Sequence, residues 1–304
     1  MSPSLRIGAR GSPLAQAQAI EVRDRLVDSG VAEAALVVAI RTSGDRIQDR
    51  TLAEAGGKGL FTKEIDQALL DGGIDLAVHS MKDVPTWLAD GLALPCMLER
   101  EDPRDVFISE AAPSLARLAP GAVVGTASLR RQAQILRRRP DLNVVPFRGN
   151  VETRLRKLGE GQADATLLAL AGLKRLGMAH VATQVIEPDE ILPAVGQGAI
   201  GIICRDGDGR VAGALAALNH ARTMERVTAE RAMLEVLDGS CRTPIAALAE
   251  VDDGGAMLLR GLISSPDGAR VYETERRGPA TEARAMGRDA GRELLELAGP
   301  GFFP

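Results

Sequence analysis

Short apolar runs and amphipathic stretches alternate along the N-terminal part of the chain. Apolar residues recur at helical spacing between Ala15 and Leu26, and Ser12 and Pro13 supply an N-cap and a proline at the first helical position. Strands and helices therefore alternate, and this order is typical of an α/β sheet with parallel strands. The predicted elements are a strand at 5–9, a helix at 12–28, a strand at 35–41, a helix around 65–69 and a strand at 75–79.

The same alternation recurs further along the chain and predicts a second α/β lobe. Helices are expected to begin at Ser128 and at Asn150, and each carries apolar residues on one side. An apolar run at 198–204 reads as a late strand, which we expect to return to the first lobe. The strands predicted for the second lobe lie at 105–109, 122–126, 143–147 and 165–170.

The remainder of the chain has a different pattern, with one helix, three strands and a last helix. The turn sequences DDGG and SPDG separate the strands, which therefore read as hairpins of a three-stranded antiparallel sheet. The predicted elements are a helix at 222–237, strands at 244–251, 256–264 and 269–277, and a helix at 280–298. We expect a first α/β lobe from residues 1–99 and 199–217, a second from residues 100–198, and a small C-terminal α+β domain from residues 218–304.

Four polar clusters share one structural position, because each follows a predicted strand. They are ARGS at 9–12, HSMKD at 79–83, GTASLRR at 125–131 and FRGNVETR at 147–154. In open α/β sheets ligands bind at the carboxyl ends of strands, and helix N-termini there attract anions. Any one cluster could be helix capping, but the four together predict a cleft for a polyanion. The donors are the hydroxyls of Thr126 and Ser128 and the guanidinium groups of Arg10, Arg130, Arg131, Arg148 and Arg154.

Charge narrows the class of ligand. The chain has 304 residues, 45% of them hydrophobic, and a formal net charge of −4, which disfavours general nucleic-acid binding. Residues 126–157 nevertheless hold eight Arg and one Lys against one Asp and one Glu, a local excess of seven positive charges. A basic block in an acidic chain indicates a specific anionic ligand, and the alternative is a solvated helix face.

Lys82 and Asp83 stand at a strand end among these cations. One interpretation is a surface ion pair, which contributes little to stability. The other is a carboxylate in a cleft lined with cations, where it acts as an acid or base or stabilises a developing positive charge.

Cysteine and histidine spacing excludes several kinds of site. Cys96, Cys204 and Cys241 show no C-x-x-C spacing, and the three histidines have no ligand spacing, so no metal site is expected. Cys241 lies in the turn sequence EVLDGSCRTPIAA, with a cation beside it, whereas a free cysteine is usually buried. Because no apolar segment is long enough to span a bilayer and the N-terminus has no signal core, we expect a soluble cytoplasmic protein.

With these residues in view, the chain closely resembles the porphobilinogen deaminase family, whose members are also called hydroxymethylbilane synthases. The resemblance covers nearly the whole length and includes RIGARGSPLA, GGKGLF, DLAVHSMKDVP, EREDPRD, GTASLRRQ, RGNVETRL, LAGLKRLG, LPAVGQGA and VTAERAM. So many motifs in one order are far more specific than any single short pattern. DGSCRTP departs from the family pattern, in which a second glycine is common before the cysteine.

The resemblance implies a transferase that joins four porphobilinogen molecules head to tail, releases ammonia at each step and hydrolyses the chain off as hydroxymethylbilane. It also implies a dipyrromethane cofactor, held by a thioether to Cys241, and two lobes similar to those of periplasmic binding proteins. Asp83 would stabilise the cation that loss of ammonia leaves. The residues expected to line the cofactor site are Lys82, Asp83, Thr126, Ser128, Arg130, Arg131, Arg148, Asn150 and Arg154, and those expected at the substrate site are Arg10, Ser12, Lys58 and Gln197.

Two other classes of protein remain open. A two-lobed protein that binds a polycarboxylate ligand without catalysis would have no need of Cys241. A nucleic-acid-binding protein would use the basic block at 126–157, and it would show steep salt dependence and stacking aromatics. The aromatic content of 2% and the acidic total weigh against nucleic acid. We expect a monomer that binds neither nucleic acid nor membrane.

Overall fold

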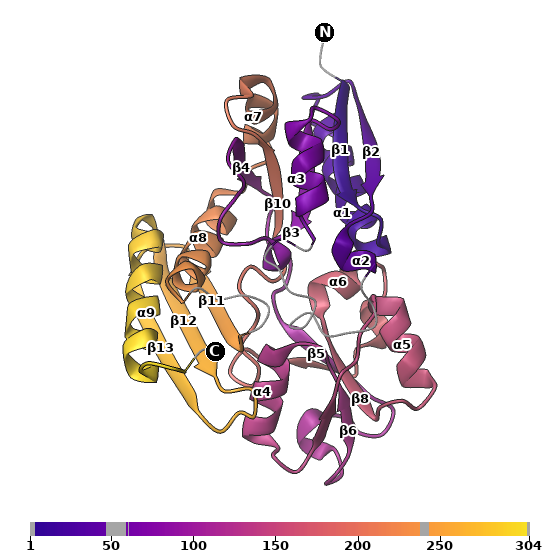
Figure 1. The fold of residues 1–304 in the computed structure, drawn as a ribbon, viewed down its shortest axis with the longest axis vertical. Coiled ribbons are helices and arrows are strands. Elements are labelled where there is room, and N and C mark those ends of the chain that lie inside the picture. The colour runs from indigo at the N-terminus through magenta and orange to yellow at the C-terminus, as the bar shows by residue number, and fades with distance from the viewer. Residues whose placement is uncertain (1–3, 47–58, 60, 238–242, 303–304) are drawn as a thin grey trace. The chain divides into compact units, whose positions relative to one another are not determined.

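The computed structural model describes residues 4–46, 59, 61–237 and 243–302, and the chain divides into two compact units (Figure 1). Lys58 and Cys241, two of the predicted site residues, lie outside the described residues. The boundaries that the sequence predicts for two lobes and a third domain stay a prediction. Of the described residues, the first unit comprises 4–46, 59, 61–101 and 198–224, and the second comprises 102–197, 225–237 and 243–302.

A five-stranded sheet with the order β2-β1-β3-β10-β4 forms the centre of the first unit. β1 runs parallel to β2 and β3, whereas β10 runs antiparallel to β3 and β4. The prediction that the run at 198–204 returns to the first sheet is confirmed. The strands are β1 (Ser4–Arg10), β2 (Ala34–Ile40), β3 (Leu76–Ser80), β4 (Leu92–Met97) and β10 (Ile200–Arg205).

The parallel order predicted from the first three strands is confirmed for β1, β2 and β3, whereas β10 runs antiparallel to β3. This strand follows the part of the chain that forms the second lobe, so no crossover helix leads from β3 into it. The rule that keeps the strands of a βαβ unit parallel therefore does not apply to β10.

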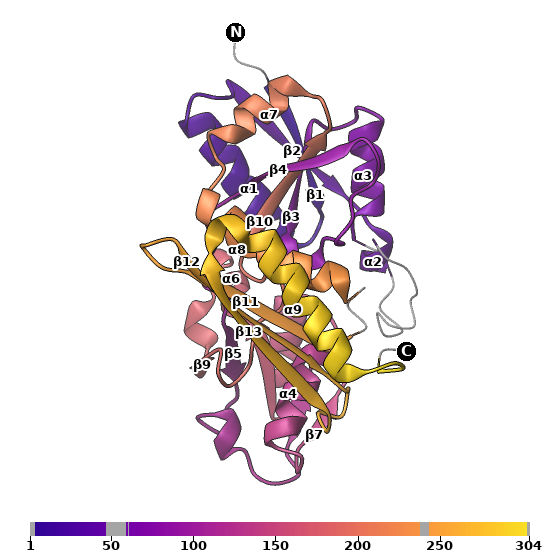
Figure 2. The same cartoon turned by 90° about the vertical axis from the view of Figure 1, so that its left-hand side faces the viewer.

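Helices α1 (Pro13–Asp28) and α3 (Lys63–Leu70) cover opposite faces of the first sheet (Figure 2). Val22 and Leu26 of α1 pack against Ile7 of β1 in the core, as the apolar spacing along α1 predicts. The shorter elements of the first unit are α2 (Ser43–Arg46), the 3₁₀ helix Met81–Asp83 and α7 (Gly209–Ala216).

A second five-stranded sheet, with the order β7-β6-β8-β5-β9, forms the predicted second lobe inside the second unit. β6 runs parallel to β7 and β8, and β5 runs antiparallel to β8 and β9. Its strands are β5 (Asp105–Ile108), β6 (Val123–Gly125), β7 (Asn143–Val145), β8 (Ala165–Ala169) and β9 (Gln184–Ile186). The helices are α4 (Leu129–Arg138), α5 (Val151–Gly159) and α6 (Leu170–Arg175), with 3₁₀ helices at Leu115–Arg117 and Ala179–Val181.

The C-terminal part of the second unit is the predicted antiparallel sheet, with the order β11-β12-β13. The long helix α9 crosses one face of this sheet (Figure 2) and buries Met286, Ala290 and Leu294 in the same core as Leu259. These findings confirm the α/β class with a small C-terminal α+β part. The elements are α8 (Ala221–Val236), β11 (Ile245–Val251), β12 (Ala256–Ser264), β13 (Val271–Pro279), the 3₁₀ helix Ala280–Glu282 and α9 (Ala283–Ala298).

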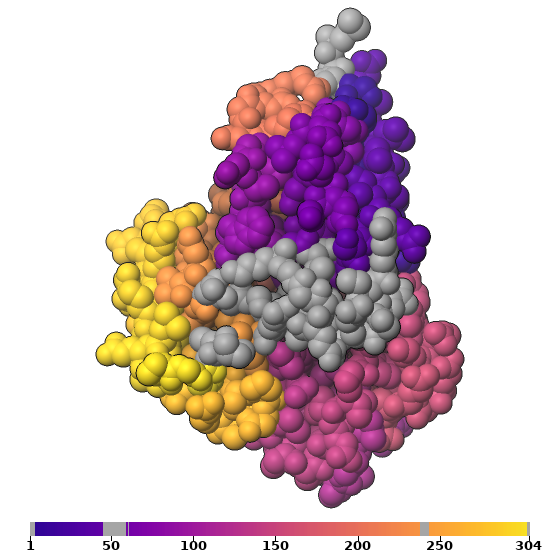
Figure 3. All heavy atoms as spheres, in the orientation of Figure 1, coloured from indigo at the N-terminus to yellow at the C-terminus, as the bar shows by residue number. Residues whose placement is uncertain are grey.

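Within the second unit, the C-terminal sheet packs against α4 of the second lobe. Figure 3 shows the orange and yellow C-terminal residues against the magenta residues of the second lobe. Arg137 Nη1 donates to Glu273 Oε1 at 2.6 Å, and Gln132 Nε2 donates to the carbonyl of Pro266 at 3.2 Å. Gly268, with φ +72°, brings its turn so close to α4 that a Cβ there would overlap the carbonyl of Ala133. The basic residues at the end of α4 therefore serve partly to join two layers of the same unit.

Replacing Gly287 by alanine should destabilise the second unit. A Cβ at Gly287 would stand 2.8 Å from Cβ of Ala232 and overlap the carbonyl of Ala229, so α8 and α9 would have to move apart. We expect the free energy of unfolding to fall by about 1–3 kcal/mol in a urea titration. Gly213→Ala in α7 is the control, because open space surrounds that position, and it should be neutral or stabilising by up to about 1 kcal/mol. Equal stability of the two variants would contradict the close packing of α8 on α9.

Candidate active site

In the first unit, two predicted site residues meet at the carboxyl edge of the sheet. Arg10 is the last residue of β1, and Asp83 ends the 3₁₀ helix that follows β3. Because β1 and β3 are parallel neighbours, their carboxyl ends lie at the same edge. Arg10 Nη1 lies 4.0 Å from Asp83 Oδ2, and both side chains are partly exposed, at 22% and 33%. The carboxylate is thus available to a ligand beside a cation, as the sequence predicts.

Neighbouring side chains fix this edge. The guanidinium of Arg10 stacks over the ring of Phe61, 4.1 Å from its centroid, and the carbonyl of Arg10 accepts a hydrogen bond from Gln16 Nε2 at 2.6 Å. Gln18 Nε2 donates to Ser80 Oγ at 2.9 Å, which holds the end of β3 just before Lys82 and Asp83. Sequence reasoning missed Gln18, although a polar residue inside the apolar stripe of α1 is a usable signal.

Ser12 and Lys82 complete the predicted set in this unit. Ser12 is the N-cap of α1, and its Oγ accepts from the backbone N–H of Ala15 at 3.4 Å. Lys82 is exposed in the 3₁₀ helix. Ser12 therefore has a capping role in the structure, and a contact of either side chain with substrate or cofactor stays a prediction.

His79 lies on β3 behind this edge and is buried, at 5% exposure. Its Nε2 has no hydrogen-bond partner among the described residues. Burial, together with the positive charge of Arg10, lowers the pKa of His79 to about 4. The imidazole is therefore neutral at physiological pH.

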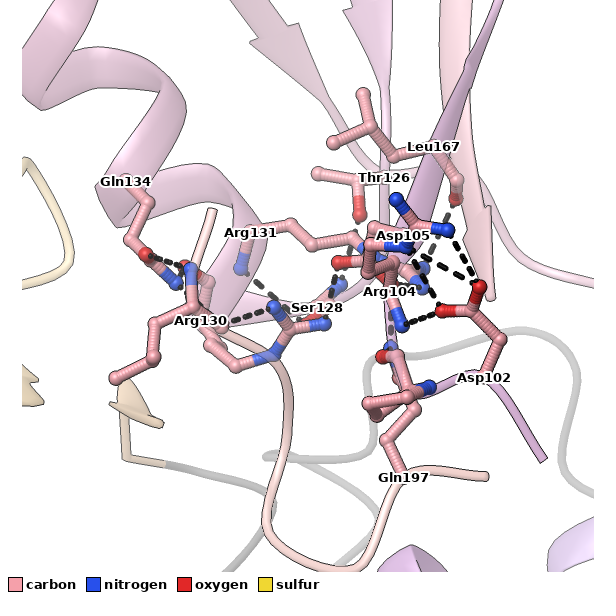
Figure 4. A network of polar contacts seen from close by, with 12 residues as sticks. Asp102, Arg104, Asp105, Thr126, Ser128, Arg130, Arg131, Gln134, Leu167 and Gln197 are labelled. Atoms are coloured by element: carbon pink, nitrogen blue, oxygen red, sulfur yellow. Dashed lines mark hydrogen bonds and ion pairs between the residues drawn. The ribbon is translucent and has the colours of Figure 1, made fainter. Parts of the chain in front are cut away.

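In the second unit, a buried carboxylate organises the beginning of α4 (Figure 4). Asp105, fully buried at the start of β5, accepts hydrogen bonds from Arg130 and Arg131, and both arginine side chains are only 6% exposed. Arg130 Nη1 also donates to the carbonyl of Leu192 at 2.7 Å, and Arg131 Nη1 to that of Leu167 at 2.9 Å. The two arginines hold the pKa of Asp105 far below its usual range in spite of its burial.

The structure thus gives Arg130 and Arg131 a partner that the sequence did not predict. Gln197, from the loop before β10, joins them because its Nε2 donates to Asp105 Oδ1 and to the carbonyl of Pro103, each at 2.7 Å. Asp105 and Gln197 are 92 positions apart, so no local pattern signals their contact.

Three other predicted residues cap turns and helices. Thr126 Oγ1 accepts from the N–H of Ser128 at 3.2 Å, and Ser128, the N-cap of α4, accepts from the N–H of Arg131 at 3.4 Å. Asn150 is the N-cap of α5 and accepts from the N–H of Thr153 at 2.8 Å. Helix capping is therefore what these oxygens do in the structure, while the hydroxyls still have a proton to donate.

Arg148 and Arg154 lie on either side of the cap of α5. Arg154 Nε donates to the carbonyl of Gly149 at 2.9 Å. Arg148 Nη1 is buried and has no hydrogen-bond partner among the described residues. Since a buried, unpaired guanidinium nitrogen is costly, an acceptor from a ligand fits this position.

The cysteines in the described part of the chain are unreactive in this setting. Cys96 on β4 and Cys204 on β10 are free and buried. Burial raises the pKa of the Cys96 thiol to about 12 and also raises that of Cys204. Within the described ranges, no group of three His, Cys, Asp or Glu side chains is placed to hold a metal ion. No helix in the same ranges is both long and apolar enough to cross a membrane.

Two family models match the chain, and together they cover most of it. Residues 5–213 match "Porphobilinogen deaminase, dipyromethane cofactor binding domain", and residues 224–296 match "Porphobilinogen deaminase, C-terminal domain". The chain belongs to the porphobilinogen deaminase family. The resemblance read from the sequence motifs is thereby confirmed.

Curated porphobilinogen deaminases are similar over nearly the whole chain. The chloroplastic protein of Oryza sativa subsp. japonica is 61% identical over 305 residues, covering 98% of this chain and 85% of that protein. The protein of Nitrobacter hamburgensis is 58% identical over 299 residues, covering 98% and 94%. Among solved structures, the methionine-binding protein MetQ is 14% identical with a TM-score of 0.45, covering 73% of this chain and 92% of that one.

The described residues fit the carboxylate-bearing cofactor that the matched porphobilinogen deaminase model names. Arg148 has a buried nitrogen without an acceptor, and the buried group of Arg130, Arg131 and Asp105 carries one more positive than negative charge. Both features favour an anion supplied from outside the protein.

Acid should destabilise the protein through His79. Its pKa is lowered in the folded state, so its contribution to stability is complete above about pH 6.5 and is lost as the pH falls toward 4. His79→Gln should remove this pH-dependent contribution, which is at most roughly 3 kcal/mol. The free energy of unfolding, measured by urea titration, should then change less between pH 6.5 and 4 than in the wild type. His180→Gln, at an exposed position, should keep the wild-type slope. A wild-type slope in His79→Gln as well would contradict a buried neutral imidazole.

Proposed function

We propose that the protein condenses four porphobilinogen molecules head to tail, with release of ammonia, into the linear tetrapyrrole hydroxymethylbilane. The observation that carries this proposal is the carboxylate of Asp83, 4.0 Å from the guanidinium of Arg10 at the sheet edge, in a chain of the porphobilinogen deaminase family. A binding protein without catalysis receives no support from the family match, since the relatives are named as deaminases.

The site residues have distinct tasks in this proposal. Each pyrrole unit carries an acetate and a propionate, so both the substrate and the dipyrromethane cofactor are polycarboxylates. When bound, the cofactor supplies the pyrrole end to which substrate is joined. The residues that would hold it are Lys82, Asp83, Thr126, Ser128, Arg130, Arg131, Arg148, Asn150 and Arg154, and those that would contact substrate are Arg10, Ser12, Lys58 and Gln197.

Asp83 acts on the reacting part of the substrate. As the C–N bond of porphobilinogen breaks and ammonia leaves, positive charge develops on the pyrrole, and a nearby carboxylate stabilises it. The pyrrole N–H is a donor that can hydrogen-bond to the same carboxylate. Arg10, paired loosely at 4.0 Å, keeps Asp83 oriented without holding it in a short ion pair.

Cys241 is the proposed tether, as a thioether to the dipyrromethane. Its thiol sulfur attacks the aminomethyl carbon of a porphobilinogen molecule, the S–C bond forms and the C–N bond breaks, and the thiol proton passes to the leaving nitrogen, which departs as ammonia. Of the three cysteines, Cys96 and Cys204 are buried with raised thiol pKa values, which disfavours this reaction. Cys241 lies outside the described residues, in a polar turn sequence next to Arg242.

The protein is further proposed to work as a monomer in the cytoplasm. The two buried cysteines, which are free rather than disulfide-bonded, accord with a reducing compartment. Sedimentation equilibrium of the purified chain measures the oligomeric state directly, and a mass near twice 32.0 kDa would contradict a monomer.

Asp83→Asn should nearly abolish turnover while leaving the fold intact. The amide cannot neutralise the positive charge that develops on the substrate, so we expect kcat to fall by at least ~100-fold with porphobilinogen. Asp90→Asn, at an exposed position of the same unit, is the matched control and should keep wild-type kcat. If Asp83→Asn turns over near the wild-type rate, Asp83 has no part in the reaction.

The native protein should be heavier than its sequence by a two-pyrrole adduct on the peptide that contains Cys241. Intact-mass and peptide-mass spectrometry measure this directly. Cys241→Ser should have its sequence mass and no turnover, and the peptides with Cys96 and Cys204 should be unmodified in both proteins because those thiols are buried. A fully active preparation with an unmodified Cys241 would rule out the tether.

A further inference from the structure

We infer that Asp105 is a positioning residue, which aims Arg130 and Arg131 at the carboxylates of the cofactor and substrate. Resting on the proposed function, this inference adds a residue that touches neither ligand in the proposal. It also gives Gln197 a task through Asp105, in addition to the contact with substrate proposed above.

Among the described residues, four hydrogen bonds reach the carboxylate of Asp105, and they come from side chains that the sequence places in the site (Figure 4). Oδ1 accepts from Arg131 Nη2 at 2.8 Å and from Gln197 Nε2 at 2.7 Å. Oδ2 accepts from Arg130 Nη2 at 2.8 Å and from Arg131 Nε at 3.1 Å. The contact of Arg131 with Asp105 is therefore bidentate, and it fixes the plane of the guanidinium. Arg130 contacts Asp105 through Nη2 alone, and its Nη1 donates to the carbonyl of Leu192.

This group is not electrically balanced. Two buried guanidinium groups share one carboxylate, so one positive charge is left over at about 6% exposure. Asp102, also drawn in Figure 4, pairs with Arg104 at 2.7 Å, and Arg104 pairs in addition with Glu187, whose side chain is 61% exposed and so is screened by water. Burial accordingly lowers the pKa of Arg130 despite its contact with Asp105. An unbalanced buried charge is costly unless an anion offsets it.

A second buried carboxylate, in the first unit, shows that one carboxylate can be shared by several arginines without a ligand. Asp75, 8% exposed, lies within 3.1–3.6 Å of Arg6, Arg205 and Arg210. Those three arginine side chains are 27–47% exposed, so water screens the excess charge. Arg130 and Arg131 lack this screening, which is the difference that points to a ligand.

The two arginines also have further N–H groups that can donate hydrogen bonds to that ligand. The hydrogen bonds described above use two N–H groups of Arg130 and three of Arg131, and a guanidinium carries more than these. Both residues lie in the first turn of the ten-residue helix α4, where the helix dipole adds to the attraction for an anion. The ligand class is a carboxylate, because a planar fork matches its two oxygens.

The test compares Asp105→Asn with Asp75→Asn, both made in the full chain carrying Cys241→Ser. Calorimetric titration with porphobilinogen then reports binding without the loaded cofactor, and urea unfolding reports stability. Both substitutions should lower stability, because both remove a carboxylate shared by arginines. Only Asp105→Asn should weaken porphobilinogen binding, by at least tenfold in Kd, while Asp75→Asn stays within about twofold of the parent.

Asp105→Glu separates position from charge, since it keeps the carboxylate but moves it by one methylene. We expect this variant to fold and to bind porphobilinogen more weakly than the parent. A folded Asp105 variant that binds porphobilinogen like the parent overturns the inference. Loss of folding in both Asp105 variants, while Asp75→Asn folds, also overturns it, because Asp105 is then purely structural. A parent that binds no porphobilinogen, together with a wild type that has no turnover, overturns the proposed function itself.

Discussion

The second lobe depends on one buried charge, the carboxylate of Asp105, and on how the chain surrounds it. Asp105 begins β5, Arg130 and Arg131 begin α4, and Gln197 lies just before β10, so three distant segments meet at one group. Removing a carboxylate from water costs several kcal/mol of desolvation free energy, and only complete hydrogen bonding offsets that cost. Here each oxygen accepts two hydrogen bonds, so the beginning of α4 cannot shift without breaking several contacts at once.

Hydrogen bonds also fix the polar loops of both units. Hydroxyl and amide oxygens of Ser12, Ser128 and Asn150 cap helices, so they are occupied by backbone N–H groups. Capping fixes the loops, and fixed loops hold the cationic side chains that follow them. Thus the predicted alternatives of helix capping and ligand binding do not compete at these positions. In the proposed site, different atoms of the same short segments would serve the two purposes.

Much of the fold could be predicted from the chain because its apolar spacing is regular. The helix at 13–28 and the three strands of the C-terminal sheet lie within a few residues of their predicted positions. β4 was missed because LALPCM contains a proline and has no alternating pattern, and β9 because three residues carry too little periodicity. The direction of β10 depends on the path of the chain through the second lobe, which no local pattern encodes.

The candidate site was predicted less completely, because the pairing of charges is decided in three dimensions. The basic block at 126–157 suggested one anion-binding surface, yet Arg137 pairs with Glu273 and Arg139 with Asp141 of the same chain, at the surface. Asp105 was counted only as the start of a strand, since its partners lie 25 and 26 positions away. A count of charges in a segment therefore overstates the number of cationic side chains that can bind a ligand.

Burial also bears on why the proposed covalent modification would fall on only one of the three thiols. Cys96 and Cys204 lie on neighbouring strands in the core of the first unit, where burial holds both as neutral thiols. An electrophilic pyrrole released in the same molecule meets no competing thiolate there. The selectivity of the proposed tether thus depends as much on the suppression of two thiols by the first sheet as on any activation of Cys241. The apolar packing that stabilises this sheet is therefore also part of the chemistry of the site.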